Sequence, residues 1–462
     1  MFWPALAPSY KFSRANAVGL DLEITSQDRS CYLRQDVQKG VVVAERRLTA
    51  YGEPEKRHLE IKLPEGTIYE AGDYLAILPF NHEASIKRVM SRFKLARNVT
   101  MTIKAGAATF LPTGVPIAVY DVLRGFVELG QPVTRKDLRV CIDASDFSPD
   151  KAALSAFCNQ DGFTKISDQR ASLVDLMERF GSINLPFSTF LSMLPPLRPR
   201  RYSISSSPLN GPTTCTVTYA IIDEAARSGV GRFIGVTGAY MASLKAGDEV
   251  SVSVRSTNKF FHLPADTQST PVMMFCGGTG IAPFRGFVQE RATQLAAGRD
   301  LAPALMFVGC RSETRDRLFA DEMDQWVREG AVDIRYAFSK EPEKSKGCKH
   351  IDERMLKDES DILRLWRAGA KVFTCGGPVL SEAVGKAACH ILIRAWRREG
   401  KSYRDNRPKN GSKRGGTRDS WWMCSPERQY RYRIQSSTSS LCRIWVYLVL
   451  SFRASHIGRL RS

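Results

Sequence analysis

The sequence predicts an antiparallel β-barrel interrupted by a helical insertion, then a doubly wound parallel sheet, and finally a disordered basic tail. Two observations predict the folded parts. Short strands separated by turn signals lie at residues 37–48, 58–63 and 72–79, which is typical of an antiparallel barrel. From residue 263 onward, short apolar strands alternate with helical stretches, and this alternation indicates a parallel sheet.

The first unit is expected over residues 33–262, after a linker at residues 1–32 that has no clear hydrophobic period. Within this unit, residues 83–195 change to helical apolar spacing and form an insertion. Its helices are expected at residues 84–95, 117–129, 151–159 and 173–180. The barrel then resumes with strands at residues 215–222 and 249–254, and with a short helix that begins at Gly235.

The second unit is expected over residues 263–390. Its apolar strands are expected at residues 272–275, 304–308, 333–338 and 371–374, with helical stretches between them. Beyond it, residues 391–462 are polar, basic and rich in Gly and Ser, without an amphipathic period. We therefore expect this tail to be mostly disordered.

The net charge of +19 would indicate a polyanionic partner if it were spread evenly, but it is concentrated in the tail. Residues 391–462 hold 17 Lys and Arg against 4 Asp and Glu, whereas the rest of the chain has a net charge of only +6. A charge run of this kind is usually a solvated tail. We therefore expect no nucleic-acid partner, although a basic contact with an acidic surface is the rival interpretation.

The 11 cysteines are scattered, without a Cys-x-x-Cys pair or the Cys/His spacing of a zinc site. This pattern predicts reduced thiols in a cytoplasmic compartment and no metal site. The longest apolar run, residues 444–452, is far too short to cross a bilayer, so no stable membrane insertion is expected.

Residues 198–208 read Arg-Pro-Arg-Arg-Tyr-Ser-Ile-Ser-Ser-Ser-Pro and are expected to be extended, since Pro199 blocks a helix and Tyr202 favours a strand. In a strand, Arg200 and Tyr202 share one face, where a guanidinium can bind phosphate oxygens and an aromatic ring can bind a flat heterocycle. Ser203 lies on the other face. The stretch predicts a site for a ring that carries a diphosphate; the alternative is an exposed basic strand entering a turn.

Residues 276–287 read Cys-Gly-Gly-Thr-Gly-Ile-Ala-Pro-Phe-Arg-Gly-Phe and leave the first strand of the second unit. At Gly278, Thr279 and Gly280, small residues let the backbone approach a pyrophosphate, and the free N–H groups at the start of the next helix point toward it. An ordinary strand-to-helix turn is the alternative. The threonine and the Pro-Phe-Arg continuation favour the nucleotide.

These two stretches, followed by Cys375-Gly376-Gly377, resemble motifs of the diflavin branch of the ferredoxin–NADP reductase superfamily. Residues 33–392 resemble the reductase end of fungal fused cytochrome P-450:NADPH reductases. The resemblance implies that the barrel unit binds FAD, that residues 83–195 are the helical connecting insertion, and that residues 263–390 bind NADP.

For FAD, the resemblance implies a phosphate contact by Arg200, a flavin contact by Tyr202 and a hydrogen bond from Ser203 near flavin N5. The backbone of Tyr219 and Ile221 would flank the isoalloxazine. A second turn would bind the FAD pyrophosphate, and it consists of Gly235, Val236, Thr237 and Gly238. At the last of these the family usually has Ser or Thr, so a hydrogen bond worth about 1.5–3 kcal/mol would be lost and FAD binding would be weaker.

For the nicotinamide nucleotide, the resemblance implies NADPH rather than NADH, because Ser339-Lys340 resembles the family's Ser-Arg pair on the 2′-phosphate. Lysine keeps the charge of arginine but loses its bidentate fork. Lys349 would add to this site, and Arg311 would contact the nucleotide. Two positions just beyond depart from the family's Tyr and Gln, and the second is unfavourable beside a phosphate: His350 and Asp352.

The implied reaction is hydride transfer from NADPH to FAD, with Ser203 and Cys375 beside the reacting rings. Electrons would pass onward to an FMN module and to a cytochrome P-450 haem domain, and this sequence contains the motifs of neither. Family members end in an aspartate that assists hydride transfer and an aromatic residue that covers the flavin. Nothing after residue 390 matches this ending. The alternatives are a catalytically impaired fragment or mispredicted gene product that keeps the fold, and the flavoprotein of another diflavin system such as sulfite reductase.

Overall fold

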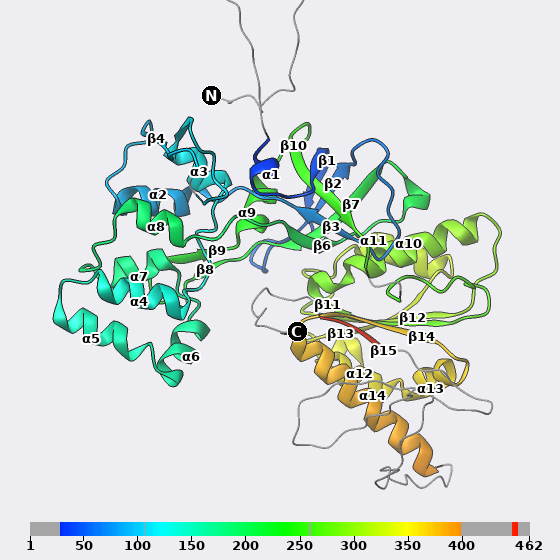
Figure 1. The fold of residues 1–462 in the computed structure, drawn as a ribbon. Coiled ribbons are helices and arrows are strands. Elements are labelled where there is room, and N and C mark those ends of the chain that lie inside the picture. The colour runs from blue at the N-terminus through cyan, green and yellow to red at the C-terminus, as the bar shows by residue number, and fades with distance from the viewer. Residues whose placement is uncertain (1–27, 107, 258–259, 399–445, 451–462) are drawn as a thin grey trace, which may run out of the picture.

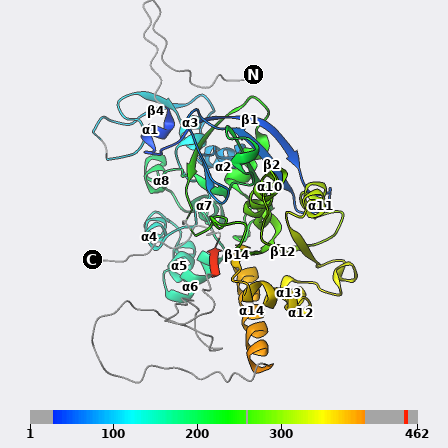
Figure 2. The ribbon, with the colours of Figure 1, turned by 90° about the vertical axis from the view of Figure 1, so that its right-hand side faces the viewer.

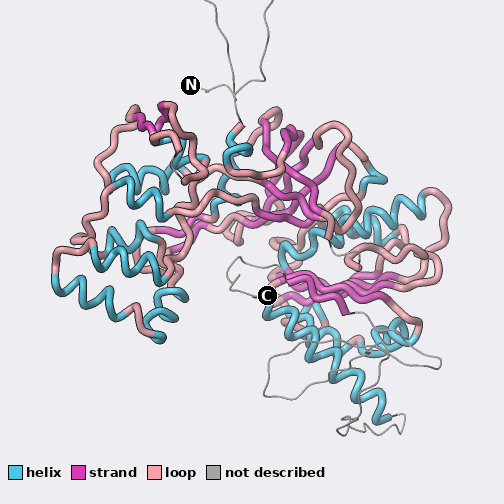
Figure 3. The backbone as a smooth tube through the Cα atoms, in the orientation of Figure 1, coloured by secondary structure: helices cyan, strands magenta, loops and turns pink. Residues whose placement is uncertain are grey.

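The computed structural model describes residues 28–106, 108–257 and 260–398, together with the backbone of residues 446–450. Figure 1 shows an antiparallel sheet flanked by a group of helices, and a parallel sheet with helices on both of its faces. Strands are confined mainly to these two sheets, and the insertion is mostly helical (Figure 3). Most of the predicted linker and most of the predicted tail lie outside the described residues.

The first sheet has six strands in the order β6-β3-β10-β1-β2-β7, all paired antiparallel. The strands are β1 (Gln38–Arg47), β2 (Lys56–Lys62), β3 (Tyr74–Ile77), β6 (Arg200–Ser203), β7 (Thr214–Ala220) and β10 (Glu249–Arg255). A bridge between Ile204 and Val217 joins the two edge strands, and the Ser205 N–H donates to the Thr216 carbonyl at 2.7 Å. The apolar residues of alternate positions, such as Leu59 and Ile61, are fully buried inside this sheet.

The insertion between β3 and β6 packs around one apolar core. Its helices are α2 (Glu83–Arg92), α3 (Val119–Gly125), α4 (Arg135–Asp143), α5 (Ser148–Ala156), α6 (Gln160–Asp168), α7 (Leu173–Arg179) and α8 (Phe187–Met193). The four predicted helices are confirmed as α2, α3, α5 and α7. The sequence pattern missed the other three, which are only two turns long or slightly more. Capping boxes at Thr134–Asp137 and Ser172–Asp175 begin α4 and α7.

Four short elements complete this unit. A helix of one turn, α1 (Arg29–Tyr32), precedes β1. Two small hairpins are formed by β4 (Thr100–Thr102) with β5 (Pro116–Ala118), and by β8 (Asp223–Ala225) with β9 (Arg232–Ile234). The helix expected from Gly235 is confirmed as α9 (Val236–Ser243).

The second sheet is parallel, with the strand order β13-β12-β11-β14-β15. Its strands are β11 (Val272–Gly277), β12 (Ala304–Cys310), β13 (Asp333–Phe338), β14 (Lys371–Gly376) and β15 (Val446–Leu450). The flanking helices are α10 (Ala282–Ala296), α11 (Ala320–Arg328), α12 (Ile351–Lys357), α13 (Glu359–Arg367) and α14 (Pro378–Arg398). Strand β11 is buried on both faces: Met274 belongs to the core under α10 and α11, and Met273 to the core under α12–α14.

The predicted start of disorder at residue 391 is wrong. Helix α14 continues to Arg398, and Ile391 and Ala395 are buried at the same helical spacing as Val384 and Ala387. Figures 1 and 2 both show α14 leading away from the antiparallel sheet. The basic residues of the last turn obscured the helical spacing of the apolar residues, because long charged side chains can cover part of an apolar helix face.

The prediction of a tail without fold is also wrong for residues 446–450. They form β15, which pairs in parallel with β14 and extends the sheet at its edge. A five-residue apolar run cannot be assigned by periodicity alone. Its pairing partner lies far back in the sequence, so only the tertiary structure reveals the strand.

One buried guanidinium joins the two sheets. Arg285 of α10 donates from Nη1 to the Ser205 carbonyl at 2.6 Å, and from Nε and Nη2 to Glu322 Oε2 of α11 at 2.8 and 2.5 Å. Its side chain is 8% exposed. Next to it, a Cβ on Gly286 would lie 2.9 Å from the Ser206 carbonyl oxygen, so α10 rests directly on the backbone after β6.

His58 lies close to this guanidinium. Its ring packs edge-on against Phe319 with centroids 5.5 Å apart, and its buried Nδ1 has no hydrogen-bond partner within the described part of the chain. Burial, together with the positive charges of Arg285 and Arg46, lowers the pKa of His58 to about 3. The histidine is therefore neutral in the folded chain at neutral pH.

We expect Arg285→Gln to lower the free energy of unfolding by about 2–4 kcal/mol, because it removes one partner of a buried, hydrogen-bonded ion pair. Arg46→Gln is the matched control. Arg46 pairs with Glu322 at 2.5 Å, but its side chain is 51% exposed. Its loss should cost less than about 1 kcal/mol. Urea unfolding of both variants measures the difference, and equal losses would show that burial of Arg285 adds nothing.

His58 should make the fold less stable as the pH falls below 6.5. Its folded pKa lies below its unfolded value of 6.5, so the unfolded chain binds the extra proton in this range. Between pH 6.5 and pH 5 the loss should be about 1.5 kcal/mol, and His58→Phe should abolish it. His82→Asn, at the exposed start of α2, should keep it. Chemical unfolding at the two pH values tests this; an unchanged slope in His58→Phe would contradict the assignment.

Candidate flavin and nucleotide site

The glycine-rich turn lies at the carboxyl end of β11, as predicted, and forms η2 (Gly278–Ile281) before α10. Gly278 has a φ of +56°, which favours glycine. A Cβ on Gly280 would lie 2.2 Å from the Cys375 carbonyl oxygen, so only glycine lets this turn rest on the end of β14. Thr279 lies between them and is half-buried.

This turn stands where the strand order reverses. Strand β11 lies between β12 and β14. The chain continues from β11 through α10 to β12 on one side, and it returns to the other side of β11 only later, as β14. Parallel sheets bind ligands in the crevice outside the carboxyl ends of strands at such a reversal. Gly278, Thr279, Gly280 and Cys375 therefore lie together at the carboxyl ends of β11 and β14.

The ends of β12 and β13 hold the residues predicted for the NADP phosphate. The Ser339 N–H donates to the Cys310 carbonyl at 3.0 Å and the Lys340 N–H to the Arg311 carbonyl at 2.9 Å, so the two strand ends stay paired. Arg311 and Lys340 are thereby neighbours. Lys349 is exposed, and among the described residues its ammonium group forms no ion pair with a carboxylate.

A carboxylate that sequence reasoning missed lies between these cations. Glu53 Oε1 accepts from Lys340 Nζ at 2.7 Å, and Glu53 Oε2 accepts from Arg311 Nη1 at 3.3 Å. Arg315 Nε, also missed, is 3.5 Å from Glu53 Oε1. Ion pairing with Lys340 and Arg311 keeps the pKa of Glu53 below its usual value. Glu53 lies in a turn between two strands, and such acidic turns normally face solvent.

On the first sheet, the cation predicted to bind phosphate is also paired with a buried carboxylate. Arg200 Nη2 donates to Glu128 Oε2 at 2.7 Å, and Arg200 Nη1 donates to Glu128 Oε1. The Arg198 N–H donates to the same oxygen at 3.0 Å. Glu128 belongs to the helical insertion, and its side chain is 3% exposed. The insertion therefore holds β6 through this pair, and nothing in the sequence pattern indicated it.

Tyr202 of β6 lies next to the start of α9. Burial raises the pKa of Tyr202 to about 12, and the buried Thr237 hydroxyl lies beside this phenol without a hydrogen bond of normal geometry. Gly235 begins α9 without a side-chain cap, followed by Val236 and Thr237. The first N–H groups of a helix have no partner within the helix, and the Thr237 hydroxyl is buried without a hydrogen-bond partner among the described residues. Both features fit a polar, anionic group such as a pyrophosphate.

The end of β7 is close to the same turn. A Cβ on Gly238 would lie 2.8 Å from the Ala220 carbonyl oxygen, so the serine or threonine expected from the resemblance would not fit without a shift of backbone. The Ile221 N–H donates to the Glu55 carbonyl at 3.0 Å. Tyr219 is buried, burial raises its pKa, and its hydroxyl has no partner of normal geometry among the described residues.

The two residues predicted to flank the reacting rings come from different sheets, and Tyr74 lies near each of them. Ser203 is opposite Tyr74 in the β3–β6 ladder. Burial raises the pKa of Tyr74 to about 12, with a smaller contribution from nearby Cys375. Burial also raises the pKa of Cys375 to about 12, which keeps this thiol neutral. Tyr74 is thus the ladder partner of Ser203 and lies near Cys375, and it is an additional candidate.

The serines that follow β6 have structural partners. Ser205 Oγ is 2.8 Å from Thr216 Oγ1, and Ser206 Oγ is 2.9 Å from the Tyr69 hydroxyl. Ser207 Oγ donates to Glu290 of α10 at 2.9 Å. This half of the predicted motif therefore fastens the turn to α10 rather than facing a ligand.

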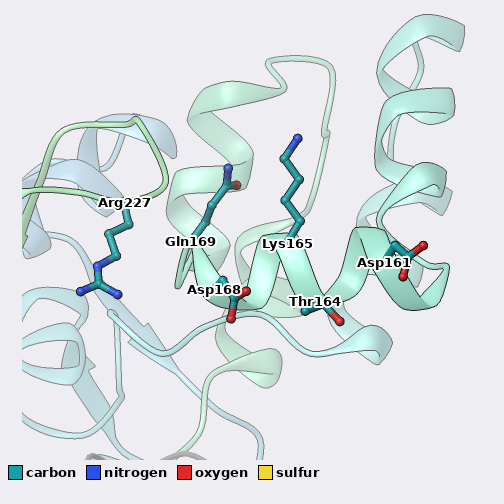
Figure 4. A pocket seen from close by; sticks show the side chains of 6 residues that line it. All are labelled: Asp161, Thr164, Lys165, Asp168, Gln169 and Arg227. Carbon is teal, nitrogen blue, oxygen red and sulfur yellow. The ribbon is translucent and has the colours of Figure 1, made fainter. Parts of the chain in front are cut away.

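A surface pocket of about 470 Å³ lies away from these residues. It is formed by α6 and Arg227 of the β8–β9 hairpin, and Figure 4 shows its polar side chains pointing in different directions. None of the predicted site residues lines it. In the described part of the chain no group of three or more His, Cys, Asp and Glu side chains could hold a metal ion. Nor does any helix there have the length and apolarity needed to span a bilayer.

Comparison with known proteins identifies two domains and a group of fungal relatives. Residues 34–240 match the FAD binding domain, and residues 274–386 match the oxidoreductase NAD-binding domain. A bifunctional cytochrome P-450/NADPH–P-450 reductase of Fusarium oxysporum is 44% identical over 85% of the chain, and one of Acremonium egyptiacum is 40% identical over 93%. A self-sufficient cytochrome P-450 monooxygenase of Exserohilum turcicum is 39% identical over 88%. The chain spans only 37–39% of the length of these three relatives.

We expect Gly280→Ala to destabilise the parallel-sheet unit by about 1–3 kcal/mol, because the added methyl group would press on the backbone of β14. Gly377→Ala is the control, since a Cβ there has no neighbour within 4 Å. It should change stability by less than about 0.5 kcal/mol. Thermal unfolding of both variants gives the comparison. If Gly280→Ala were as stable as the control, the turn would not require glycine at this position.

Proposed function

We propose that the chain, which matches an FAD binding domain and an oxidoreductase NAD-binding domain, transfers hydride from NADPH to FAD. Electrons would pass onward to an FMN module that serves a cytochrome P-450 haem domain, as the names of its relatives suggest. The enzyme type is thus an NADPH–cytochrome P-450 reductase.

The observation that carries this proposal is the junction of the two sheets at Tyr74. Hydride transfer requires the donor and acceptor carbon and nitrogen atoms to approach to about 3–3.5 Å. Ser203 of β6 is the ladder partner of Tyr74, and Cys375 of β14 lies near the same tyrosine. A ring held on β6 and a ring held at the end of β14 would therefore meet.

The proposed roles follow from the surroundings of each residue. FAD, when bound, supplies the hydride acceptor. The Ser203 hydroxyl donates a hydrogen bond at the flavin edge. The neutral Cys375 thiol excludes water beside the nicotinamide without adding a charge. Arg200 meets a phosphate only by sharing or exchanging its bonds to Glu128. The unsatisfied Thr237 hydroxyl and the N–H groups of α9 meet the pyrophosphate.

Three finer features belong to the same proposal. The bridge from Ile204 to Val217 supports closure of the first sheet into an FAD-binding barrel. Ser339 and Lys340, paired with the end of β12, support NADPH over NADH. Among the described residues the cysteines form no disulfide, which supports a reducing, cytoplasmic compartment.

The first test is the visible spectrum of the purified chain, followed by anaerobic addition of NADPH. We expect a flavin spectrum that bleaches. Thr237→Val should weaken FAD retention by about 10- to 100-fold, because it removes a hydrogen bond to a charged group. Thr164→Val removes only a bond within exposed α6 and is the control. Equilibrium dialysis against free FAD measures retention.

A flavin spectrum that persists on addition of NADPH would favour the catalytically impaired alternative. A colourless chain that also fails to take up added FAD would contradict the proposed function itself. If Thr237→Val and Thr164→Val retained FAD equally, the start of α9 would lose its assigned role.

A further inference from the structure

We propose that Glu53 is an affinity-determining residue that competes with the 2′-phosphate of NADP(H) for Arg311, Arg315 and Lys340. This inference rests on the proposed function, because it assigns a new residue to the nucleotide site. The carboxylate comes from the antiparallel sheet, whereas the three cations come from the parallel-sheet unit. Binding of the nucleotide phosphate therefore requires Glu53 to give up its bonds.

The carboxylate is enclosed, whereas the cations are not. The side chain of Glu53 is 3% exposed, but those of Arg311, Arg315 and Lys340 are 46%, 49% and 54% exposed. Solvent, and hence a dissolved phosphate, can reach the cationic groups while Glu53 occupies the space between them. Three positive charges face one negative charge, so the group keeps an excess of positive charge that attracts an anion.

The other acidic groups beside these cations have partners elsewhere. Asp316 accepts from Lys56 Nζ and from the Arg311 N–H, the latter at 3.0 Å. Glu341 accepts from the Glu313 N–H at 2.8 Å and lies 3.6 Å from Lys344 Nζ. These groups are fixed by their own bonds. Glu53 is therefore the carboxylate whose position coincides with that of an anion bound by all three cations.

Backbone contacts hold Glu53 in this place. The Ala50 N–H donates to the Arg315 carbonyl at 2.9 Å, and Arg315 Nη2 donates to the Tyr51 carbonyl at 2.6 Å. The turn that carries Glu53 is thus hydrogen-bonded to the segment after β12. Gly52, with a φ of +87°, gives the turn its tight course. Glu53 is presented by a docked turn and not by a chance side-chain rotamer.

A phosphate dianion is the ligand that this group suits. It offers three oxygens and more negative charge than a carboxylate, and it accepts charge-assisted hydrogen bonds from arginine and lysine. A ribose 2′-hydroxyl would instead donate to Glu53 and leave it in place, as acidic residues do in sites for NAD. The two cases predict opposite effects when the charge of Glu53 is removed.

The experiment compares Glu53→Gln with the wild-type chain in titration calorimetry against 2′,5′-ADP and 5′-AMP, which differ by the 2′-phosphate. We expect Glu53→Gln to bind 2′,5′-ADP at least about tenfold more tightly, the equivalent of one charge-assisted hydrogen bond. Its affinity for 5′-AMP, which carries a 2′-hydroxyl instead, should stay unchanged or fall. Glu53→Asp keeps the charge with a shorter reach, and its gain should be intermediate.

Glu55→Gln is the matched control. It removes the same charge from the same turn, but Glu55 pairs with Arg47 at 3.2 Å and with Arg57 at 2.7 Å, away from the three cations. It should leave both affinities unchanged. A thermal unfolding curve without ligand shows that each variant is folded. If Glu53→Gln did not fold, the graded response of Glu53→Asp would decide the question.

Weaker binding of 2′,5′-ADP by Glu53→Gln, or an equal change for both ligands, would overturn the inference. So would an equal gain in Glu55→Gln, or no binding of either nucleotide by any variant. Failure of the proposed function is seen separately, in the flavin spectrum and its response to NADPH. If NADPH bleaches the flavin of the wild-type chain but Glu53→Gln does not change the affinity for 2′,5′-ADP, the role of Glu53 as a competitor is rejected and the proposed reductase function stands.

Discussion

The buried guanidinium of Arg285 is the constraint on which the arrangement of the two sheets depends. It lies in the helix that follows the glycine-rich turn, and it donates to the carbonyl of Ser205, which follows the strand of Arg200 and Tyr202. The two motifs that stand out in the sequence are therefore in direct contact. Because Gly286 also lets α10 rest on the Ser206 backbone, a shift of either motif would displace the other.

Carboxylates from distant segments hold the cations of both predicted phosphate sites. Glu128 of the insertion binds Arg200, and Glu53 of the β1–β2 turn binds Arg311 and Lys340. The side chains of both carboxylates are 3% exposed, and a buried charge is stable only with a partner, which these cations provide. The same pairs join segments of the fold to one another. Ligand binding and packing of the units are thus physically coupled through these residues.

Much of the fold could be predicted because it depends on local patterns. The strands of the parallel sheet are short, apolar runs separated by helical spacing, and the glycine-rich turn is required by a close approach that glycine alone permits at position 280. The site residues of this turn and of β6 could be named for the same reason. Helices α4, α6 and α8 were missed, although α3, α5 and α7 are no longer, so helix length does not explain which of them the pattern revealed.

The sequence by itself determined the order of the units, the glycine-rich turn and the cations at the ends of β12 and β13. Only the tertiary structure decided which carboxylates meet those cations, that Tyr74 lies near Ser203 and Cys375, and that residues 446–450 extend the parallel sheet. The physical reason is range. Local propensity and backbone sterics act between neighbours in sequence, whereas ion pairs and parallel strand pairing join residues whose proximity exists only after the chain has folded.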